Sequence, residues 1–393
     1  MQREVGRYER TAAAGETVSA FIPDRLPPAN PPLSLDAGTR DLLRSAEQKL
    51  SRLDLAGEMV PSIEWFIYAF VRKEAVLSSQ IEGTQATLVD LLAFEASAEG
   101  SASAGPTSDV QEVCNYVDGL AYARRQLQSP KGLPLSMRLL NEAHRRLMKG
   151  SRGANRQPGE IRRSQNWIGG TRPGNAAFVP PPPNELGRLL ADLQKYIHRE
   201  DDLPPLVRAA LVHVQFETIH PYLDGNGRIG RLLITLLLEH WKLLSQPLLY
   251  LSLFLKQHRA EYYRLLNAVR LEGAWEGWVA FFLEAVSTIA DEAATTARDL
   301  FVVVNKDRAR VLGARNSSVT AARLLEILPR RPVVTIPAIV KLLKTSKPTA
   351  AKAVSVLERL GILEEMTGRR RDRTYGYSSY LERLRAGTDL VEG

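Results

Sequence analysis

The sequence contains a single cysteine, Cys114, and no run of eighteen apolar residues. One cysteine excludes an internal disulfide framework and is typical of proteins in a reducing compartment. Without a long apolar run we expect no membrane-spanning helix. The charged first ten residues also lack the apolar core of a secretory signal. These absences predict a cytoplasmic protein with no membrane partner.

The 393 residues, of which 44% are hydrophobic and 24% charged, are enough for two or three domains. The net charge of +8 is unevenly distributed. Residues 315–385 hold 15 Lys and Arg against 6 Asp and Glu, a balance of +9, so the rest of the chain has a balance of −1. This asymmetry indicates a polyanion partner for the C-terminal segment alone.

Helical periodicity covers most of the chain after residue 35. The first 35 residues contain a dense proline cluster, which disfavours helix, so we expect an irregular, extended segment there. The patterns predict an N-terminal extension (1–60), a helical region (61–108), a helical core (109–300) and a small C-terminal domain (315–385).

One short stretch, residues 220–231, concentrates reactive side chains in the order His-Pro-Tyr-Leu-Asp-Gly-Asn-Gly-Arg-Ile-Gly-Arg. It lies between apolar helical runs at 206–219 and 232–244. A glycine-rich turn that leads into a helix N-terminus directs several backbone N–H groups at one point, which favours an anion. Arg228 and Arg231, one helical turn apart, can both reach the oxygens of a phosphate bound there.

Two further side chains in this stretch complete a candidate phosphate-transfer site. Asp224 can hold a magnesium ion that bridges phosphates, and His220 is suited to proton transfer near neutral pH. Each feature has a structural explanation when taken alone, since Gly-Asn-Gly turns join buried helices and a single histidine at a helix end is usually structural. Their combination in one turn favours the functional interpretation.

The stretch resembles, at nearly every position, the signature of the Fic family, His-Pro-Phe-x-Asp/Glu-Gly-Asn-Gly-Arg-x-x-Arg. The one departure is Tyr222 in place of the usual Phe, which retains an aromatic ring and adds a hydroxyl. The resemblance implies an all-α fold with a Fic-type helical core over roughly residues 60–300 and a short β-hairpin flap. We expect a winged helix-turn-helix domain at the C-terminal end.

The resemblance also implies an activity, the transfer of AMP from ATP to a hydroxyl of a target protein or of the chain itself. His220 would accept the hydroxyl proton, and Asp224 would hold Mg²⁺ across the phosphates. Backbone amides and guanidinium groups would stabilise the charge that develops on the phosphate and on the leaving pyrophosphate. The residues in this role are Gly225, Asn226, Gly227, Arg228 and Arg231.

A second motif, Ser78-x-x-x-Glu82-Gly83, lies upstream at the end of a predicted helix. It resembles the inhibitory motif of the Fic family, Ser/Thr-x-x-x-Glu-Gly/Asn, whose glutamate pairs with the second arginine of the signature, here Arg231. The resemblance implies that Glu82 competes with ATP for Arg231. It also permits a role for Glu82 in removing AMP by orienting a water molecule.

Residues 158–180 interrupt the helical rhythm, and their Gly, Pro and Asn content predicts two short strands in a hairpin. An exposed strand edge is a docking surface for an extended peptide. The hairpin resembles the Fic flap, so we expect the target protein to dock on residues 161–180. In the family, the counterparts of three flap residues line the nucleotide pocket: Trp167, Ile168 and Gly169.

Three residues outside the signature have more than one interpretation. Tyr262 resembles, by its position, the tyrosine that family members stack near adenine, but plain core packing explains it equally well. Arg270 stands where some relatives have an asparagine that contacts the base, so the base is not fixed. His144 lies within a predicted helix, and we interpret it as structural.

Residues 315–385 pattern as three short helices followed by strands with a basic tip, an order that resembles a winged helix-turn-helix. We expect DNA contacts from residues 346–373, with the tip against the DNA backbone. The third helix would direct four polar or basic residues towards the duplex: Ser346, Lys347, Thr349 and Lys352. Winged helices also mediate dimerisation and protein docking, so a homodimer remains an alternative.

Two other functions remain open at this point. One is a DNA-binding regulator in which the helical core senses a nucleotide. The other is transfer of a different group to protein, such as UMP or phosphocholine. The intact glycine-rich turn and both arginines favour a nucleoside triphosphate donor over phosphocholine, but they do not select adenine over other bases.

Overall fold

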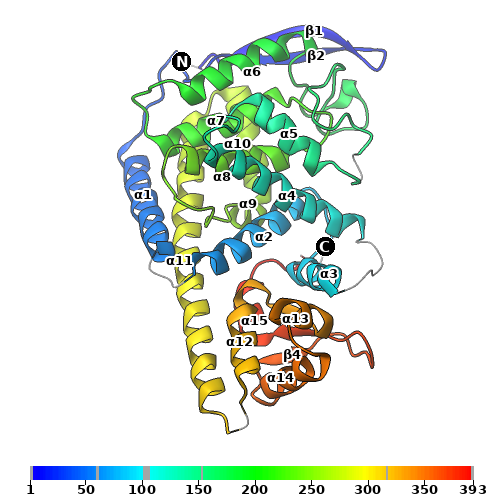
Figure 1. Cartoon of the computed structure of the whole chain (residues 1–393). Helices are drawn as coiled ribbons and strands as arrows, with labels where there is room; N and C mark the ends of the chain where they lie inside the picture. The colour runs from blue at the N-terminus through cyan, green and yellow to red at the C-terminus, as the bar shows by residue number, and fades with distance from the viewer. Residues whose placement is uncertain (1–2, 59–61, 101–106, 152–153, 316, 391–393) are drawn as a thin grey trace. The chain divides into compact units, whose positions relative to one another are not determined.

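The computed structural model describes residues 3–58, 62–100, 107–151, 154–315 and 317–390 of the chain. The structure is predominantly helical, as the sequence predicts (Figure 1). The chain divides into two compact units that interleave along the sequence. The first unit comprises Met1–Ser51, Asn115–Ser245 and Phe254–Ala290, and the second comprises Arg52–Cys114, Gln246–Leu253 and Asp291–Gly393. The expected boundary at residues 60–61 lies outside the described residues.

The first unit carries the 220–231 stretch. Its elements are β1 (Gly6–Ala13), β2 (Glu16–Pro23), α5 (Met137–Leu147), α6 (Pro183–His198), α7 (Pro205–Ile219), α8 (Asn226–His240) and α10 (Arg259–Glu272), with a short 3-10 helix at Pro173–Asn175. Some helices contribute residues to both units: α1 (Ala37–Glu58), α4 (Ser108–Gln128), α9 (Ser252–Gln257) and α11 (Trp275–Gly313).

Two consecutive helices, α7 and α8, form the interior of the first unit (Figure 1). Residues 206–219 of α7 and 228–238 of α8 are all buried. A helix that is apolar all round must be covered on every side, which explains the two nearly continuous apolar runs in the sequence. Trp278 of α11 donates its indole N–H to the carbonyl of Ala210 at 2.8 Å. This bond satisfies the polar end of the largest buried side chain.

Residues 6–23 form an antiparallel β-hairpin, so the expectation of an irregular N-terminal segment is wrong. The two strands pair along their whole length through a two-residue turn, Ala14-Gly15, with φ of 47° and 83°. A turn with positive φ at both positions matches the twist of the flanking strands. The proline cluster begins only at Pro23, where β2 ends, and therefore terminates the hairpin without preventing it.

Aromatic packing and one backbone hydrogen bond attach this hairpin to the segment before α6. The N–H of Phe21 donates to the carbonyl of Val179 at 2.9 Å. The Phe21 ring centroid lies 5.3 Å from that of Tyr8 and 6.2 Å from that of Phe178. Phe21 is buried and Tyr8 is 56% exposed, so the contact runs from the surface of β1 into the interior.

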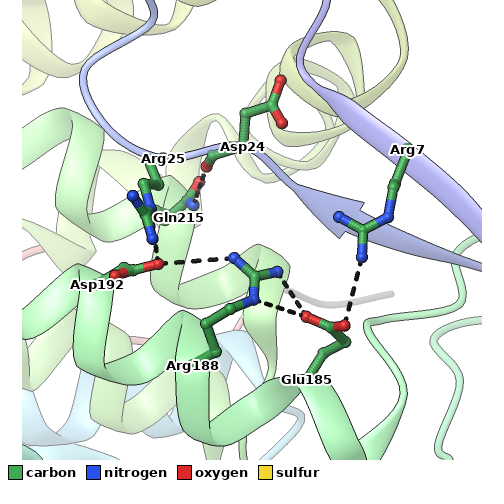
Figure 2. Close-up of polar contacts among 7 residues, drawn as sticks. All are labelled: Arg7, Asp24, Arg25, Glu185, Arg188, Asp192 and Gln215. Atoms are coloured by element: carbon green, nitrogen blue, oxygen red, sulfur yellow. Dashed lines mark hydrogen bonds and ion pairs between the residues drawn. The ribbon is translucent and has the colours of Figure 1, made fainter.

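A chain of alternating charges joins the hairpin to the outer face of α6 (Figure 2). Arg7 lies 3.3 Å from Glu185, Arg188 bridges to both α6 carboxylates, and Arg25 lies 2.9 Å from Asp192. The Arg7 and Arg25 side chains are mostly exposed, so solvent screens these pairs. The charges therefore orient the hairpin, and the buried aromatic ring holds it.

The second unit combines two helices, α2 (Ile63–Ile81) and α3 (Leu88–Gly100), with a small C-terminal fold. The fold consists of α12 (Val319–Ile327), a 3-10 turn (Leu328–Arg330), β3 (Val333–Thr335), α13 (Ile336–Leu343), α14 (Lys347–Arg359), β4 (Leu363–Glu365), β5 (Thr374–Tyr377) and α15 (Ser378–Leu384). Its antiparallel sheet has the strand order β3-β5-β4. Three helices followed by a hairpin that completes a small sheet is the winged-helix arrangement that the sequence predicts.

Side-chain caps explain where the three helices of this fold begin. Ser318, Thr335 and Ser346 each accept a hydrogen bond from the backbone N–H three residues later. Such caps satisfy donors that the first turn of a helix leaves unpaired. The hydroxyl of Tyr377 donates to Asp307 at 2.9 Å and joins the sheet to the C-terminal part of α11.

We expect the aromatic contact, and not the surface charges, to decide the stability of the hairpin. Replacing Phe21 with Ala removes a buried ring and should cost about 3 kcal/mol or more. Replacing Arg188 with Gln breaks screened ion pairs and should cost about 1 kcal/mol or less. Urea denaturation of the two variants measures both effects, with Tyr8→Ala as an exposed aromatic control. Equal losses for Phe21→Ala and Arg188→Gln would show that the charges carry the attachment.

Candidate active site

The turn between α7 and α8 reverses the chain with two left-handed residues. His220 follows the last residue of α7 with φ 50° and ψ 61°, and its N–H donates to the carbonyl of Phe216 at 3.0 Å. Gly225 precedes α8 with φ 79°. A Cβ at Gly225 would lie 3.0 Å from the Met148 sulfur and 3.3 Å from His144 Nε2, so both backbone conformation and space require glycine there. α8 begins at Asn226, so Gly227 and Arg228 lie in its first helical turn.

A pair of hydrogen bonds between Asn226 and Tyr222 closes the turn. The Asn226 side chain accepts the N–H of Tyr222 and donates to its carbonyl, both at 2.8 Å. Because these bonds occupy the buried Asn226 amide, the predicted phosphate contact of this residue would have to use its backbone N–H. The Tyr222 hydroxyl, absent from the usual Phe, donates to Asn141 of α5 at 2.8 Å.

His144 of α5 packs against the same turn, as its interpretation as a structural residue predicts. Its ring stacks on Tyr222 with centroids 3.9 Å apart and planes 8° apart. Nδ1 accepts the N–H of Gly159 at 2.8 Å, so the proton lies on Nε2, which donates to the carbonyl of Asp224 at 2.9 Å. Burial lowers the pKa of His144 to about 4 and keeps it neutral in this role.

The first turn of α8 gathers positive charge around unpaired backbone donors. The first N–H groups of a helix have no acceptor within the helix and favour an anion. Arg228 lies in this turn and Arg231 in the next turn of α8, and they are 5% and 2% exposed. Asp224, whose side chain is 46% exposed, lies 3.6 Å from Arg228 and accepts the N–H of Gly225 at 2.6 Å. Two nearly buried guanidinium groups beside a helix N-terminus suit a polyphosphate.

His220, the C-cap of α7, is partly exposed as a residue, but the Nδ1 atom of its ring is buried. Burial, then the positive charges of Arg270 and Arg162, lower its pKa to about 3. The imidazole is therefore unprotonated at physiological pH and can accept a proton.

Arg162 is a buried arginine, and no motif in the sequence identifies it as part of the site. It donates through Nε to the carbonyl of His220 at 3.0 Å and through Nη2 to that of Pro181 at 2.6 Å. Its own N–H donates to the carbonyl of Pro221 at 2.9 Å. Burial lowers the pKa of Arg162 to about 10, so it remains charged. One side chain thus fixes the His220 backbone to both ends of the flap segment.

The flap pairs its two arms, but it does not form the two regular strands that the sequence predicts. Ile168 and Phe178 exchange both backbone hydrogen bonds, at 2.8 and 3.1 Å, as an isolated antiparallel bridge. Gly169 and Gly170 have positive φ, and residues 180–183 are prolines without an N–H, so the ladder cannot extend. Trp167 and Ile168 are partly exposed, and their contacts with a nucleotide remain a prediction.

Tyr262 lies in the interior of the first unit, 1% exposed. Its hydroxyl and His213 Nε2 are 2.9 Å apart, and Trp278 packs against both rings. Burial lowers the pKa of His213 to about 3, so this ring is neutral. The structure thus places Tyr262 as the core-packing alternative describes, and an adenine contact by Tyr262 remains a prediction.

The inhibitory motif lies at the C-terminal end of α2, in the second unit. Ser78 is buried, Glu82 is the exposed C-cap, and Gly83 has φ 91°. A carboxylate at a helix C-terminus opposes the helix dipole, so its position is locally unfavourable. Its pairing with Arg231 remains a prediction.

Two classes of site are missing from the residues that the structure describes. No group of three or more His, Cys, Asp or Glu side chains could hold a metal ion. No helix in the same residues is long and apolar enough to span a membrane.

Comparison with known families identifies two adjacent matches. Residues 40–125 match the family model described as Fic/DOC family N-terminal, and residues 134–238 match that of the Fic/DOC family. The second match contains the turn, the flap and both signature arginines.

Curated relatives include the protein adenylyltransferase Fic of Drosophila grimshawi, 31% identical over 181 residues. This alignment covers 45% of the present chain and 34% of the relative. The protein of the same name from Drosophila melanogaster is 33% identical over 135 residues, 34% of this chain and 25% of the relative. The chain therefore spans only about a third of the length of these relatives.

Two solved structures share the fold. A Fic family protein from Desulfovibrio desulfuricans G20 aligns over 88% of this chain and 98% of its own, with a TM-score of 0.56 and 21% identity. A Fic domain containing signaling protein from Bacteroides thetaiotaomicron VPI-5482 aligns over 64% and 95%, with a TM-score of 0.51 and 20% identity.

The buried neutral histidines predict a loss of stability in acid. The pKa values of His144 and His213 lie below the unfolded value of about 6.5, so the unfolded chain binds protons first as the pH falls. Stability is complete above pH 6.5, and at pH 5 each histidine should have lost about 2 kcal/mol. Urea denaturation at both pH values measures this. His144→Gln should flatten the pH dependence and His258→Gln, an exposed control, should not; a wild type equally stable at both pH values would contradict the assignment.

Proposed function

We propose that this chain, which belongs to the Fic/DOC family, is a protein adenylyltransferase that moves AMP from ATP to a hydroxyl side chain of a target protein. The observation that carries the proposal is the turn itself. A neutral His220 ends α7, and the first two turns of α8, directly after the connecting turn, carry Arg228 and Arg231, both almost entirely buried. This arrangement combines a proton acceptor with a polyphosphate site, and transfer from a nucleoside triphosphate needs both.

In the proposed reaction the target hydroxyl oxygen forms a bond to the α-phosphorus of ATP, and the bond from that phosphorus to the bridging oxygen breaks. His220 accepts the hydroxyl proton, and pyrophosphate leaves. The backbone N–H groups from Gly225 to Gly227 offset charge on the transferred phosphoryl group. Arg228 and Arg231 offset charge on the pyrophosphate.

The bound nucleotide also changes the basicity of His220. In the free protein, Arg162 and Arg270 disfavour the imidazolium form. The negative charge of a triphosphate opposes both arginines and raises the pKa of His220 towards its usual value. The histidine therefore becomes a better proton acceptor when the donor is bound.

Asp224 fits a Mg²⁺ ion shared with the nucleotide. Its carboxylate is half-exposed at the edge of the turn, and one carboxylate with substrate phosphates is a usual ligand set for this ion. Mg²⁺ bound there would neutralise phosphate charge.

The flap, residues 161–180, is the proposed docking surface for the target protein or for a segment of the chain itself. Its single bridge uses the N–H and the carbonyl of Ile168, and Trp167 beside it is partly exposed. An extended peptide can pair with such an edge. The pocket residues do not fix the base, so transfer of UMP remains an alternative to transfer of AMP.

Glu82 is the proposed regulator of the site. The motif at the end of α2 supports competition between its carboxylate and ATP for Arg231. An exposed C-cap is a suitable position, because the local helix dipole disfavours a carboxylate and a cationic partner would relieve it. The same carboxylate could orient the water that removes AMP from a modified protein.

We expect His220→Ala to reduce AMP transfer by about a hundredfold or more, because the proton acceptor is lost. Glu82→Gly should increase self-modification over the wild type. Intact-mass measurement after exposure to each nucleoside triphosphate tests both, with His240→Ala as a histidine control on α8. An added mass equal to AMP supports the proposal, and equal labelling of wild type and Glu82→Gly would remove the inhibitory role.

A second candidate function, DNA binding, is favoured by the basic surface of the winged helix. Lys347 and Lys352 project from the exposed face of α14. Arg369, Arg370 and Arg371 are exposed in the loop between β4 and β5, and none of these five forms an ion pair with any residue that the structure describes. Unneutralised charge on one helix and one loop suits a phosphate backbone.

Hydrogen bonds hold the start of the basic loop, which favours a defined binding surface over an unstructured loop. The Glu365 carboxylate accepts the N–H groups of Thr367 and Gly368, at 2.8 and 3.0 Å. The Thr367 hydroxyl, which also donates to Glu365, and then these N–H groups lower the pKa of Glu365. The Glu365 carboxylate is therefore engaged in hydrogen bonds at the start of the loop.

Replacing Arg369, Arg370 and Arg371 with Gln should weaken binding to a random DNA duplex uniformly and should lower the salt slope by about one per lost phosphate contact. Fluorescence anisotropy across a salt series measures this. Arg383→Gln is the control, because that arginine is paired with Asp299 in the same unit. Absence of salt-dependent binding, together with a dimer in sedimentation, would favour the dimerisation alternative.

A further inference from the structure

Arg270, near the end of α10, is a buried arginine that holds the last turn of α7. It is 6% exposed. Its Nη2 donates to the carbonyl of Glu217 at 3.1 Å, and its Nε donates to the hydroxyl of Thr218 at 3.2 Å. A cation at a helix C-terminus is favourable because the last carbonyls have no donors within the helix. These contacts end two residues before His220.

The same guanidinium group contacts the flap. It lies 4.1 Å from the centroid of the Phe178 ring, within the range of a cation–π interaction. Phe178 is the flap residue that exchanges both backbone bonds with Ile168. Arg270 therefore touches both the arm that presents a target and the helix that presents the histidine. Nη1 donates to Asn267 of α10 at 3.2 Å, which fixes the orientation of the fork.

The N-terminal hairpin also contacts the Phe178 ring. Phe21 packs on the Phe178 ring, with centroids 6.2 Å apart, and its N–H holds the carbonyl of Val179. Phe178 thus contacts both Arg270 and Phe21.

We propose that Arg270 is a positioning residue that locks the flap and the end of α7 into one geometry, so that a hydroxyl docked on the flap meets His220. The inference rests on the proposed function, since it assigns the flap to the target and the histidine to proton transfer. An arginine is needed because only its planar fork donates along one edge while its face stacks on an aromatic ring.

The charge of Arg270 has a second effect, which mutation can separate from the effect of its hydrogen bonds. The charged side chains that act on the His220 ring are Arg270, from α10, and Arg162, from the start of the flap, and Arg270 has the larger influence. Removing its charge should raise the pKa of His220. Keeping the charge but losing the fork should leave that pKa low and disturb only the geometry.

Three variants test the proposal: Arg270→Gln, Arg270→Lys and Phe178→Leu, with Arg259→Gln as an exposed arginine control on the same helix. Histidine-resolved NMR titration of the nucleotide-free protein measures the pKa of His220. Self-modification with labelled ATP, in wild-type and Glu82→Gly backgrounds, measures transfer, and titration calorimetry measures ATP affinity.

We expect Arg270→Gln to raise the pKa of His220 by about 1 and to reduce kcat for transfer about tenfold or more. Arg270→Lys should reduce kcat while the pKa remains low. Phe178→Leu, which keeps Arg270, should also reduce kcat with little change in ATP affinity. Arg259→Gln should change none of these values.

The outcomes separate this inference from the proposed function. If the wild type never transfers AMP, the enzymatic proposal fails and the positioning role fails with it, and a raised pKa of His220 in Arg270→Gln would then show only the effect of charge. If folded Arg270→Lys and Phe178→Leu transfer AMP at the wild-type rate, the positioning role is overturned. Should Arg270→Gln not fold, the other two variants still decide the result.

Discussion

The hydrogen bonds between the Asn226 side chain and the Tyr222 backbone are the contact on which the site depends. They close a turn that joins two helices with almost no exposed surface. Because neither helix can shift inside a close-packed interior, the turn has one geometry. His220 at one end and the N-terminus of α8 at the other therefore keep a fixed relation.

Buried arginines surround this turn, and each has a specific cost and use. A buried charge is expensive unless hydrogen bonds or opposite charges compensate it. Arg162 and Arg270 are compensated mainly by backbone carbonyls at the end of α7 and in the flap. Burial, and after it the charge of these two arginines, lowers the pKa of His220 and keeps its ring neutral. The same two residues stabilise the fold and set the chemistry of the histidine.

The second unit follows a different electrostatic rule. On α14 and in the loop between β4 and β5 it carries exposed lysines and arginines that form no ion pairs within the described residues, whereas the exposed arginines around α6 are paired. Exposed unpaired charge contributes little to folding, so it is available for a polyanion. The proposed enzyme site and the proposed DNA surface are thus distinguished by burial: the first uses desolvated charges at short range and the second uses solvated charges at long range.

The sequence by itself determined the helical class, the winged-helix order and the signature turn, because periodicity, caps and glycine positions are local properties. It did not determine the N-terminal hairpin, since a proline cluster next to β2 dominated the local pattern. Nor did it indicate Arg162, or decide what Tyr262 and Arg270 contact. Those contacts join residues 49 to 58 positions apart, and only the packing of α7 against the flap and α10 brings them together. The local sequence identified the candidate reacting groups, and tertiary packing determined which charged side chains act on His220.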